Sequence, residues 1–184
     1  MKVTATELPE VLLIEPRLFS DKRGHFFETW VDPRYREAGI PKPFVQDNFS
    51  RSAFGTLRGL HFQTPNAQGK LVTVLAGRIF DVAVDLRTDS PRFAQWVGFE
   101  LDGDAPRQLW IPPGFGHGFC VISEYADFFY KCTSFYSPDT ERSVRWDDPD
   151  LAIDWPIDEP LISDRDAQAP LLAEAPVLPT MDSP

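Results

Sequence analysis

The stretch Ile79-Phe80-Asp81-Val82-Ala83-Val84-Asp85-Leu86 is a run of β-branched and aromatic residues that two aspartates interrupt. Successive side chains of a strand point to opposite faces, so Asp81 and Asp85 share one face with Ala83, and the larger apolar residues 80, 82, 84 and 86 share the other. An unpaired buried carboxylate is costly. If both faces are covered, the acidic face must therefore look into a polar cavity or a hydrogen-bond network. The pattern alone is equally compatible with a polar face in solvent.

Short strand-like runs fill most of the chain on both sides of this stretch. Turn signals such as Ala76-Gly77 and Asp102-Gly103-Asp104 separate them. Many short strands with little helix predict an all-β sandwich or barrel. The expected strands are Val11–Ile14, His25–Val31, Lys70–Leu75, Arg78–Arg87, Gln95–Leu101, Arg107–Ile111, Gly118–Ile122, Asp127–Thr133 and Ser143–Trp146.

Helix is expected in one short segment only, Asp32–Gly39, with Asp32 as N-cap, Pro33 at the first helical position and Gly39 at the stop. At 184 residues, the chain fits one domain, which we expect over residues 1–168. From Ala169 to residue 184 the chain is rich in Pro and Ala and lacks Lys and Arg. That composition predicts a loosely ordered C-terminal tail.

Composition and charge exclude several classes of protein. Hydrophobic residues make up 42% and aromatic residues 13%, which is typical of a folded core. A net charge of -10 argues against general binding to nucleic acid or anionic membranes, although a few arginines still allow a small anionic ligand. Cys120 and Cys132 form no disulfide framework or zinc motif. The N-terminus lacks the apolar core of a signal peptide, and no apolar run has membrane-spanning length, so we expect a cytoplasmic protein.

Three ionisable side chains lie at the centres of separate apolar segments: His61 in Arg58-Gly59-Leu60-His61-Phe62-Gln63, then Lys70 and Tyr130. Burial shifts the pKa values of such groups and so suits them to proton transfer. A base, a cation and a phenol together suit deprotonation beside a carbonyl group. Each of the three is, taken singly, also compatible with an ordinary core side chain that has one hydrogen-bond partner.

The chain resembles the dTDP-4-dehydrorhamnose 3,5-epimerase family of deoxysugar-nucleotide epimerases from about Leu13 to Asp166. The matching stretches are Phe19–Glu28, Gln46–Ser50, Leu57–Gln63, Gly77–Arg87, Ile111–Phe119, Tyr130–Tyr136, Trp146–Pro149 and Leu161–Asp166. The resemblance implies a cupin-type jelly-roll β-sandwich that works as a homodimer with no metal and no organic cofactor. It also implies epimerisation at C3 and C5 of a dTDP-linked 4-keto-6-deoxyhexose, giving dTDP-4-dehydro-L-rhamnose.

The resemblance also implies roles for individual residues. His61 is the base that removes the protons flanking the 4-keto group, Asp166 is its hydrogen-bonded partner, Lys70 stabilises the enolate and Tyr130 returns a proton from the opposite face. The residues matching ligand contacts of the family are Arg23 and Arg58 (diphosphate), Tyr136 (thymine), and Glu28, Gln46, Asn48, His117, Glu141 and Arg165. Taken alone, Glu28 or Glu141 is most often a solvated charge, and Gln46 or Asn48 is most often a turn residue. Arg165 departs from the family, where Lys is common.

Arg58 and His61 are three residues apart, so simple alternation places them on opposite faces of a strand. For both to meet one ligand, the strand must twist or bulge, and Gly59 is the residue that permits it.

Three alternatives remain. Pro112-x-Gly114-x-x-His117 resembles the second motif of metal-dependent cupins, but His61-Phe62-Gln63 lacks the His-x-His pair of the first motif. The same catalytic residues also fit a relative that inverts C3 or C5 alone in the synthesis of an antibiotic sugar. A third alternative is a jelly roll that binds a sugar nucleotide without catalysis.

Overall fold

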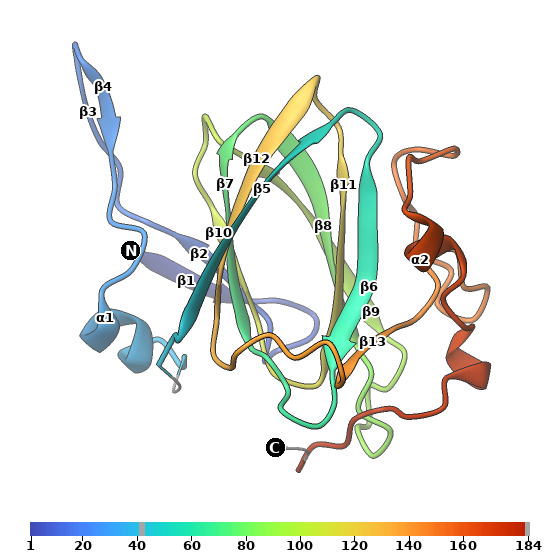
Figure 1. Ribbon diagram of the computed structural model, residues 1–184. Coiled ribbons are helices and arrows are strands. Elements are labelled where there is room, and N and C mark those ends of the chain that lie inside the picture. The colour runs from blue at the N-terminus through green and yellow to red at the C-terminus, as the bar shows by residue number, and fades with distance from the viewer. Residues whose placement is uncertain (41–42, 183–184) are drawn as a thin grey trace.

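The computed structural model describes residues 1–40 and 43–182, and its main body is two antiparallel sheets packed face to face (Figure 1). The strands of the first sheet, in spatial order, are β1 (Lys2–Ala5), β2 (Leu12–Glu15), β10 (Gln108–Ile111), β7 (Lys70–Ala76), β12 (Tyr125–Cys132) and β5 (Gln46–Ala53). Those of the second are β13 (Glu141–Ser143), β6 (Leu57–Gln63), β11 (Phe115–Val121), β8 (Arg78–Asp85) and β9 (Trp96–Asp102). The predicted all-β sandwich is confirmed.

Helix is scarce in residues 1–40 and 43–182, as expected. The helical elements there are α1 (Asp32–Glu37), α2 (Asp164–Ala167) and the 3₁₀ turn η1 (Leu172–Glu174). The predicted helix at residues 32–39 is confirmed, but Val31 is its N-cap and Asp32 its first helical residue. In the part of the chain that the structure describes, no helix is long and apolar enough to cross a membrane.

Both faces of β8 are buried, as its alternation allows. Ile79 and Ala83 belong to the apolar cluster between the sheets, whereas Val82 and Val84 belong to a second cluster on the outer side. Asp81 and Asp85 are fully buried on the inner side. The expectation of a polar network is therefore confirmed, and the alternative of a solvent-facing acidic side is wrong.

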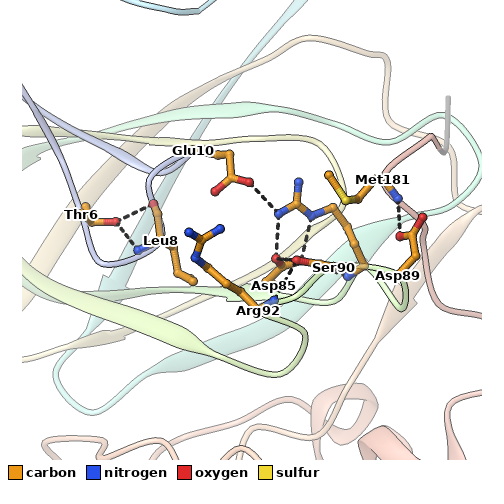
Figure 2. A network of polar contacts seen from close by, with 9 residues as sticks. Thr6, Leu8, Glu10, Asp85, Asp89, Ser90, Arg92 and Met181 are labelled. Atoms are coloured by element: carbon orange, nitrogen blue, oxygen red, sulfur yellow. Dashed lines mark hydrogen bonds and ion pairs between the residues drawn. The ribbon is translucent and has the colours of Figure 1, made fainter.

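Figure 2 shows the network of polar contacts around Asp85. Asp85 accepts hydrogen bonds from Arg87 Nε at 2.8 Å, Arg87 Nη2 at 2.7 Å and Ser90 Oγ at 2.6 Å. Arg87 also donates to Glu10 at 3.1 Å and lies over the ring of Phe115. These donors compensate the desolvation of the Asp85 carboxylate, so they hold its pKa below the ordinary value although burial acts to raise it.

The C-terminal residues pack more closely against the sandwich than their composition indicated. Leu172 is buried in the outer apolar cluster, and its N–H donates to Asp148 Oδ2 at 2.6 Å. Met181 N–H donates to Asp89 Oδ1 at 2.7 Å (Figure 2). The outer apolar face of β8 requires a cover, and this segment supplies part of it. Residues 183–184 of the expected loose tail lie outside the described residues.

A narrow hairpin of β3 (Phe19–Asp21) and β4 (Gly24–Phe26) projects away from both sheets (Figure 1). The strand expected over residues 25–31 is therefore confirmed only at its start, and residues 27–31 form no strand. No strand was expected over β5, whose Ser- and Asn-containing sequence lacks β-branched residues. It forms a strand because residues 46–53 pair along their whole length with the antiparallel strand β12.

Candidate active site

A cavity of about 300 Å³ opens between the two sheets. Strands β5, β7 and β12 of the first sheet face it, and β6 of the second sheet faces it from the other side. Its lining residues are Gln46, Asn48, His61, Gln68, Lys70, Tyr130, Tyr136 and Glu141. Seven of these eight were expected from the sequence, and Gln68 was not; it is held by a bond from its side chain to the Ser134 carbonyl at 2.8 Å.

His61 forms a hydrogen bond with Asp166, which lies 105 residues later in the sequence. The distance from His61 Nε2 to Asp166 Oδ1 is 2.6 Å. Asp166 is on α2, which lies against the outer side of β6 (Figure 1), and it is only 3% exposed. Burial acts to raise the pKa of Asp166, but hydrogen bonds from His61, from the Gly59 backbone and from Ser163 hold it below the ordinary value. The carboxylate therefore stays charged and fixes the Nε2–H tautomer, which leaves Nδ1 of His61 to take a proton.

Lys70 and Tyr130 approach the cavity from neighbouring strands, since Lys70 pairs with Cys132 on β12. Burial lowers the pKa of the Lys70 ammonium, and the acidic groups nearby oppose that shift only in part. Burial raises the pKa of Tyr130 to about 12, with a small opposing effect of Arg58. At neutral pH the phenol thus keeps its proton and can donate it.

His117 lies behind the residues that line the cavity and is not itself a lining residue. It lies opposite His61 in the β6–β11 register, and its Nε2 is 3.0 Å from the buried Asp81 Oδ2. The ring stacks on Phe128 with centroids 5.9 Å apart. Burial lowers the pKa of His117, and the Lys70 charge adds to that effect. His117 thus adjoins the site but does not belong to the lining residues.

A second set of contacts joins Tyr136 to two other lining residues, Gln46 and Glu141. Tyr136 N–H donates to Gln46 Oε1 at 2.8 Å, and its hydroxyl donates to Glu141 Oε2 at 2.7 Å. Arg165 Nη1 lies 2.6 Å from the same Glu141 oxygen. The longer side chain at position 165 is therefore well placed to pair with Glu141.

The expected irregularity of β6 is confirmed. His117 pairs with His61 and Phe119 with Arg58, so three steps along β6 match two along β11. Gly59 within this bulge has φ +127°, and a Cβ there would lie 2.5 Å from Gly118 Cα. Arg58 then donates from Nε and Nη2 to Ser52 Oγ, each at 3.2 Å.

Arg23 and Glu28 do not line the cavity of the chain to which they belong. Arg23 is on the turn of the projecting hairpin, paired with Asp21 at 2.6 Å, and its side chain is 84% exposed. Glu28 forms an ion pair with Arg34. The other expected site residues converge on or beside the cavity.

Sequence reasoning missed Ser52, Asp81 and Ser163 as contacts of site residues. Ser163 carried a local signal in the capping pattern Ser-x-x-Asp that ends at Asp166. Asp81 carried one in the alternation of residues 79–86, but that pattern did not reveal His117 as its partner. Within residues 1–40 and 43–182, no three His, Cys, Asp or Glu side chains gather as metal ligands would. Both interior histidines instead pair with a carboxylate.

Residues 5–174 match the family model described as dTDP-4-dehydrorhamnose 3,5-epimerase. The chain is 55% identical over 181 residues to the dTDP-4-dehydrorhamnose 3,5-epimerase of Pseudomonas aeruginosa, covering 97% of this chain and 100% of that one. A dTDP-6-deoxy-D-glucose-3,5-epimerase from Legionella pneumophila, solved in complex with dTDP-4-keto-L-rhamnose, superposes with a TM-score of 0.95 at 52% identity, covering 98% of each chain.

A 3'-monoepimerase from Streptomyces bikiniensis, solved in complex with dTDP-quinovose, is also similar, with a TM-score of 0.91 at 36% identity. The match covers 97% of this chain and 93% of that one. These structural matches support the cupin-type jelly roll expected from the resemblance.

The bulge in β6 generates a stability prediction with a matched control. Gly59→Ala and Gly24→Ala introduce a Cβ at nearly the same φ, +127° and +129°, but only Gly59 has atoms within 4 Å of it. We expect Gly24→Ala to lower the free energy of unfolding by about 1–3 kcal/mol through backbone strain. Gly59→Ala should lower the free energy of unfolding by about 1–3 kcal/mol more than Gly24→Ala does, because the new Cβ forces β6 and β11 apart. Urea denaturation measures both, and equal losses would contradict the close approach at Gly59.

Proposed function

The chain belongs to the dTDP-4-dehydrorhamnose 3,5-epimerase family, and from this premise we propose that it inverts both C3 and C5 of dTDP-4-dehydro-6-deoxy-D-glucose. Members of this family are isomerases that epimerise a dTDP-linked keto-deoxysugar, and this chain is one of them. The product of the double inversion is dTDP-4-dehydro-L-rhamnose. One observation carries the proposal: His61, paired with the buried Asp166, shares a single cavity with Lys70 and Tyr130.

The first step is removal of a proton from the carbon beside the 4-keto group. His61 Nδ1 takes this proton, because Nε2 is engaged with Asp166. The electron pair of the C–H bond forms the C=C bond of an enolate, and negative charge moves to the keto oxygen. The Asp166 carboxylate stabilises the imidazolium that results.

Lys70 is the group that meets the enolate charge. An ammonium in a partly desolvated site stabilises a charge that develops mainly in the transition state and intermediate, which is how binding energy raises kcat. Lys70 lines the cavity beside Tyr130, and burial makes its charge less well solvated by water.

Tyr130 then gives its hydroxyl proton to the same carbon from the opposite side, and the carbon is inverted. This leaves a Tyr130 phenolate and a His61 imidazolium, so the phenolate takes a proton from water and the imidazolium releases one to water before the second carbon is inverted. His61 and Tyr130 come from opposite sheets, which supports a geometry with the sugar between them. Both steps transfer only protons, and side chains alone can do this. We therefore propose that the reaction uses neither a metal nor an organic cofactor.

We propose that the active form is a homodimer in which the projecting hairpin completes the site of a second copy. The resemblance assigns Arg23 and Glu28 to the ligand, yet both lie outside the cavity of their own chain. The hairpin also exposes Phe19 and Phe26, whose rings lie 6.3 Å apart. Among the described residues, the hairpin forms a two-stranded sheet of its own and pairs with neither main sheet. A second copy that receives the hairpin accounts for both observations.

A second candidate function is inversion at one carbon only. The 3'-monoepimerase from Streptomyces bikiniensis has the same overall fold as this chain, so the fold does not distinguish the two activities. The difference between neighbouring carbons depends on the placement of the sugar against the acid and the base, on the ångström scale.

The first prediction of this proposed function concerns deuterium exchange by the base. In deuterated water, the wild-type protein should incorporate deuterium at both C3 and C5 of dTDP-4-keto-6-deoxyglucose and yield the inverted sugar, as followed by NMR. His61→Asn should lose at least about 10²-fold of exchange at both carbons, because a general base is removed. Unchanged thermal unfolding of the variant serves as the control. Wild-type exchange and inversion at one carbon would establish the single-site alternative, and no exchange would refute the epimerase function.

The second prediction separates the acid from the base. Tyr130→Phe should reduce inversion more than exchange, because abstraction by His61 proceeds without the returning proton of the phenol. The same NMR experiment measures both rates. Equal loss of exchange and inversion in Tyr130→Phe would contradict the division of labour between the two residues.

The third prediction tests the homodimer by mixing two defective subunits. In a mixed dimer of Arg23→Ala and His61→Asn, the cavity of the first subunit keeps His61 and receives an intact Arg23 from its partner. Random reassortment should therefore restore about a quarter of wild-type activity. If Arg23 serves its own chain, neither site in the mixed dimer is intact and no activity returns. Sedimentation of each variant as a dimer is the control.

A further inference from the structure

Ser52 holds one edge of the Arg58 guanidinium. Arg58 Nε and Nη2 both donate to Ser52 Oγ, each at 3.2 Å. A guanidinium has a side edge, formed by Nε and one terminal nitrogen, and an end edge, formed by its two terminal nitrogens. The serine oxygen occupies the side edge. Within residues 1–40 and 43–182 the guanidinium makes no other hydrogen bond or ion pair, so its end edge remains for a ligand.

The oxygen that Arg58 meets has a fixed position. Ser52 lies on β5, six residues before Arg58 in the sequence. Alternation along the strand places it on the same face as Gln46 and Asn48, which line the cavity. Ser52 is only 6% exposed, and it pairs with Ala126 of β12. An acceptor on a paired and buried strand therefore orients a long side chain that is itself exposed.

The acceptor for Arg58 carries no charge. Arg51, the residue before Ser52 on the same strand, is paired instead with the Asp127 carboxylate at 2.6 Å. A carboxylate partner offsets the positive charge of a guanidinium and so weakens its attraction for phosphate. A hydroxyl fixes the plane of the guanidinium without this loss.

We propose that Ser52 is a positioning residue for the diphosphate of the nucleotide sugar, because it fixes the plane of the Arg58 guanidinium and leaves the end edge and the full charge to the phosphate oxygens. This inference rests on the proposed function and deepens it, since it requires a ligand with phosphate groups. Two parallel N–H···O bonds to phosphate need a defined guanidinium plane. Orientation before binding therefore removes part of the entropy cost of binding.

Three substitutions on one face of β5 test the role of this hydroxyl. Ser52→Ala removes the acceptor. Ser52→Asp keeps an acceptor at the same place and adds a negative charge. Ser50→Ala is the matched control: it removes a hydroxyl two residues away on the same face, and in the described part of the chain the Ser50 side chain has no hydrogen-bond partner.

The first measurement is the Kd for dTDP by isothermal titration calorimetry with the full-length protein. We expect the Kd to rise about tenfold in Ser52→Ala and further in Ser52→Asp, and to stay within about twofold in Ser50→Ala. For turnover of dTDP-4-keto-6-deoxyglucose, Ser52→Ala should raise KM by a similar factor and leave kcat within about twofold. The reason is that the phosphates do not react, so their contacts are alike in the ground state and the transition state.

A double-mutant cycle with Arg58→Ala separates positioning of Arg58 from a general effect on β5. Arg58→Ala should itself raise the Kd for dTDP at least about tenfold. In that background, Ser52→Ala should change the Kd by less than about twofold, because the side chain that it positions is gone. A loss in the Arg58→Ala background equal to the loss in the wild-type background would overturn the proposal.

Other results would overturn the proposal as well. These are equal affinities of Ser52→Ala and Ser50→Ala, a wild-type affinity of Ser52→Asp, and an unchanged affinity of Arg58→Ala. Failure of the proposed function gives a different result. A wild-type protein that binds dTDP but incorporates no deuterium at C3 or C5 refutes the epimerase activity, whereas the binding data still decide the role of Ser52.

Discussion

The contact between Asp166 and His61 joins the C-terminal part of the chain to the middle of the second sheet, and much of the site depends on it. A carboxylate that is almost fully buried is tolerated only where donors replace the water it has lost. The hydrogen bond with His61 meets this requirement for Asp166. The bulge in β6 brings Arg58 and His61 to one region.

The sandwich holds a second imidazole–carboxylate pair, and its surroundings differ. His117 and Asp81 lie inside the sandwich, where the side chains are 7% and 0% exposed, whereas the His61 side chain is 28% exposed at the cavity. Burial lowers the pKa of His117, and its ring stacks on Phe128, so this imidazole is a packed side chain behind the cavity rather than a group that faces it. Similar residues therefore serve different purposes, because only one of the two rings has open space in front of it.

The C-terminal segment completes the structure in two ways. Its apolar residues cover the outer face of β8, and the chain that leads to them carries α2 and Asp166 to the back of β6. The Asp148 carboxylate accepts N–H groups of Asp150, Leu151 and Leu172, so it fixes the turn from which this segment starts and the point to which it returns. One stretch of chain therefore covers the outer core and carries the carboxylate that pairs with His61.

The sequence alone was sufficient for most strands, because the alternation of side chains along residues 79–86 and its equivalents is a local property that the sheet preserves. Family resemblance predicted catalytic roles for His61, Lys70, Tyr130 and Asp166, and the need for an irregular strand at Gly59 followed from the spacing of Arg58 and His61. Local patterns did not reveal β5, because its pairing with β12 and not its own composition makes it a strand. Nor did they reveal the packing of residues 169–182 or the position of Arg23 outside its own cavity. These features depend on contacts between segments that are far apart in the sequence: strand pairing, burial of apolar surface and pairing of buried polar groups. Only the tertiary structure brings such segments together.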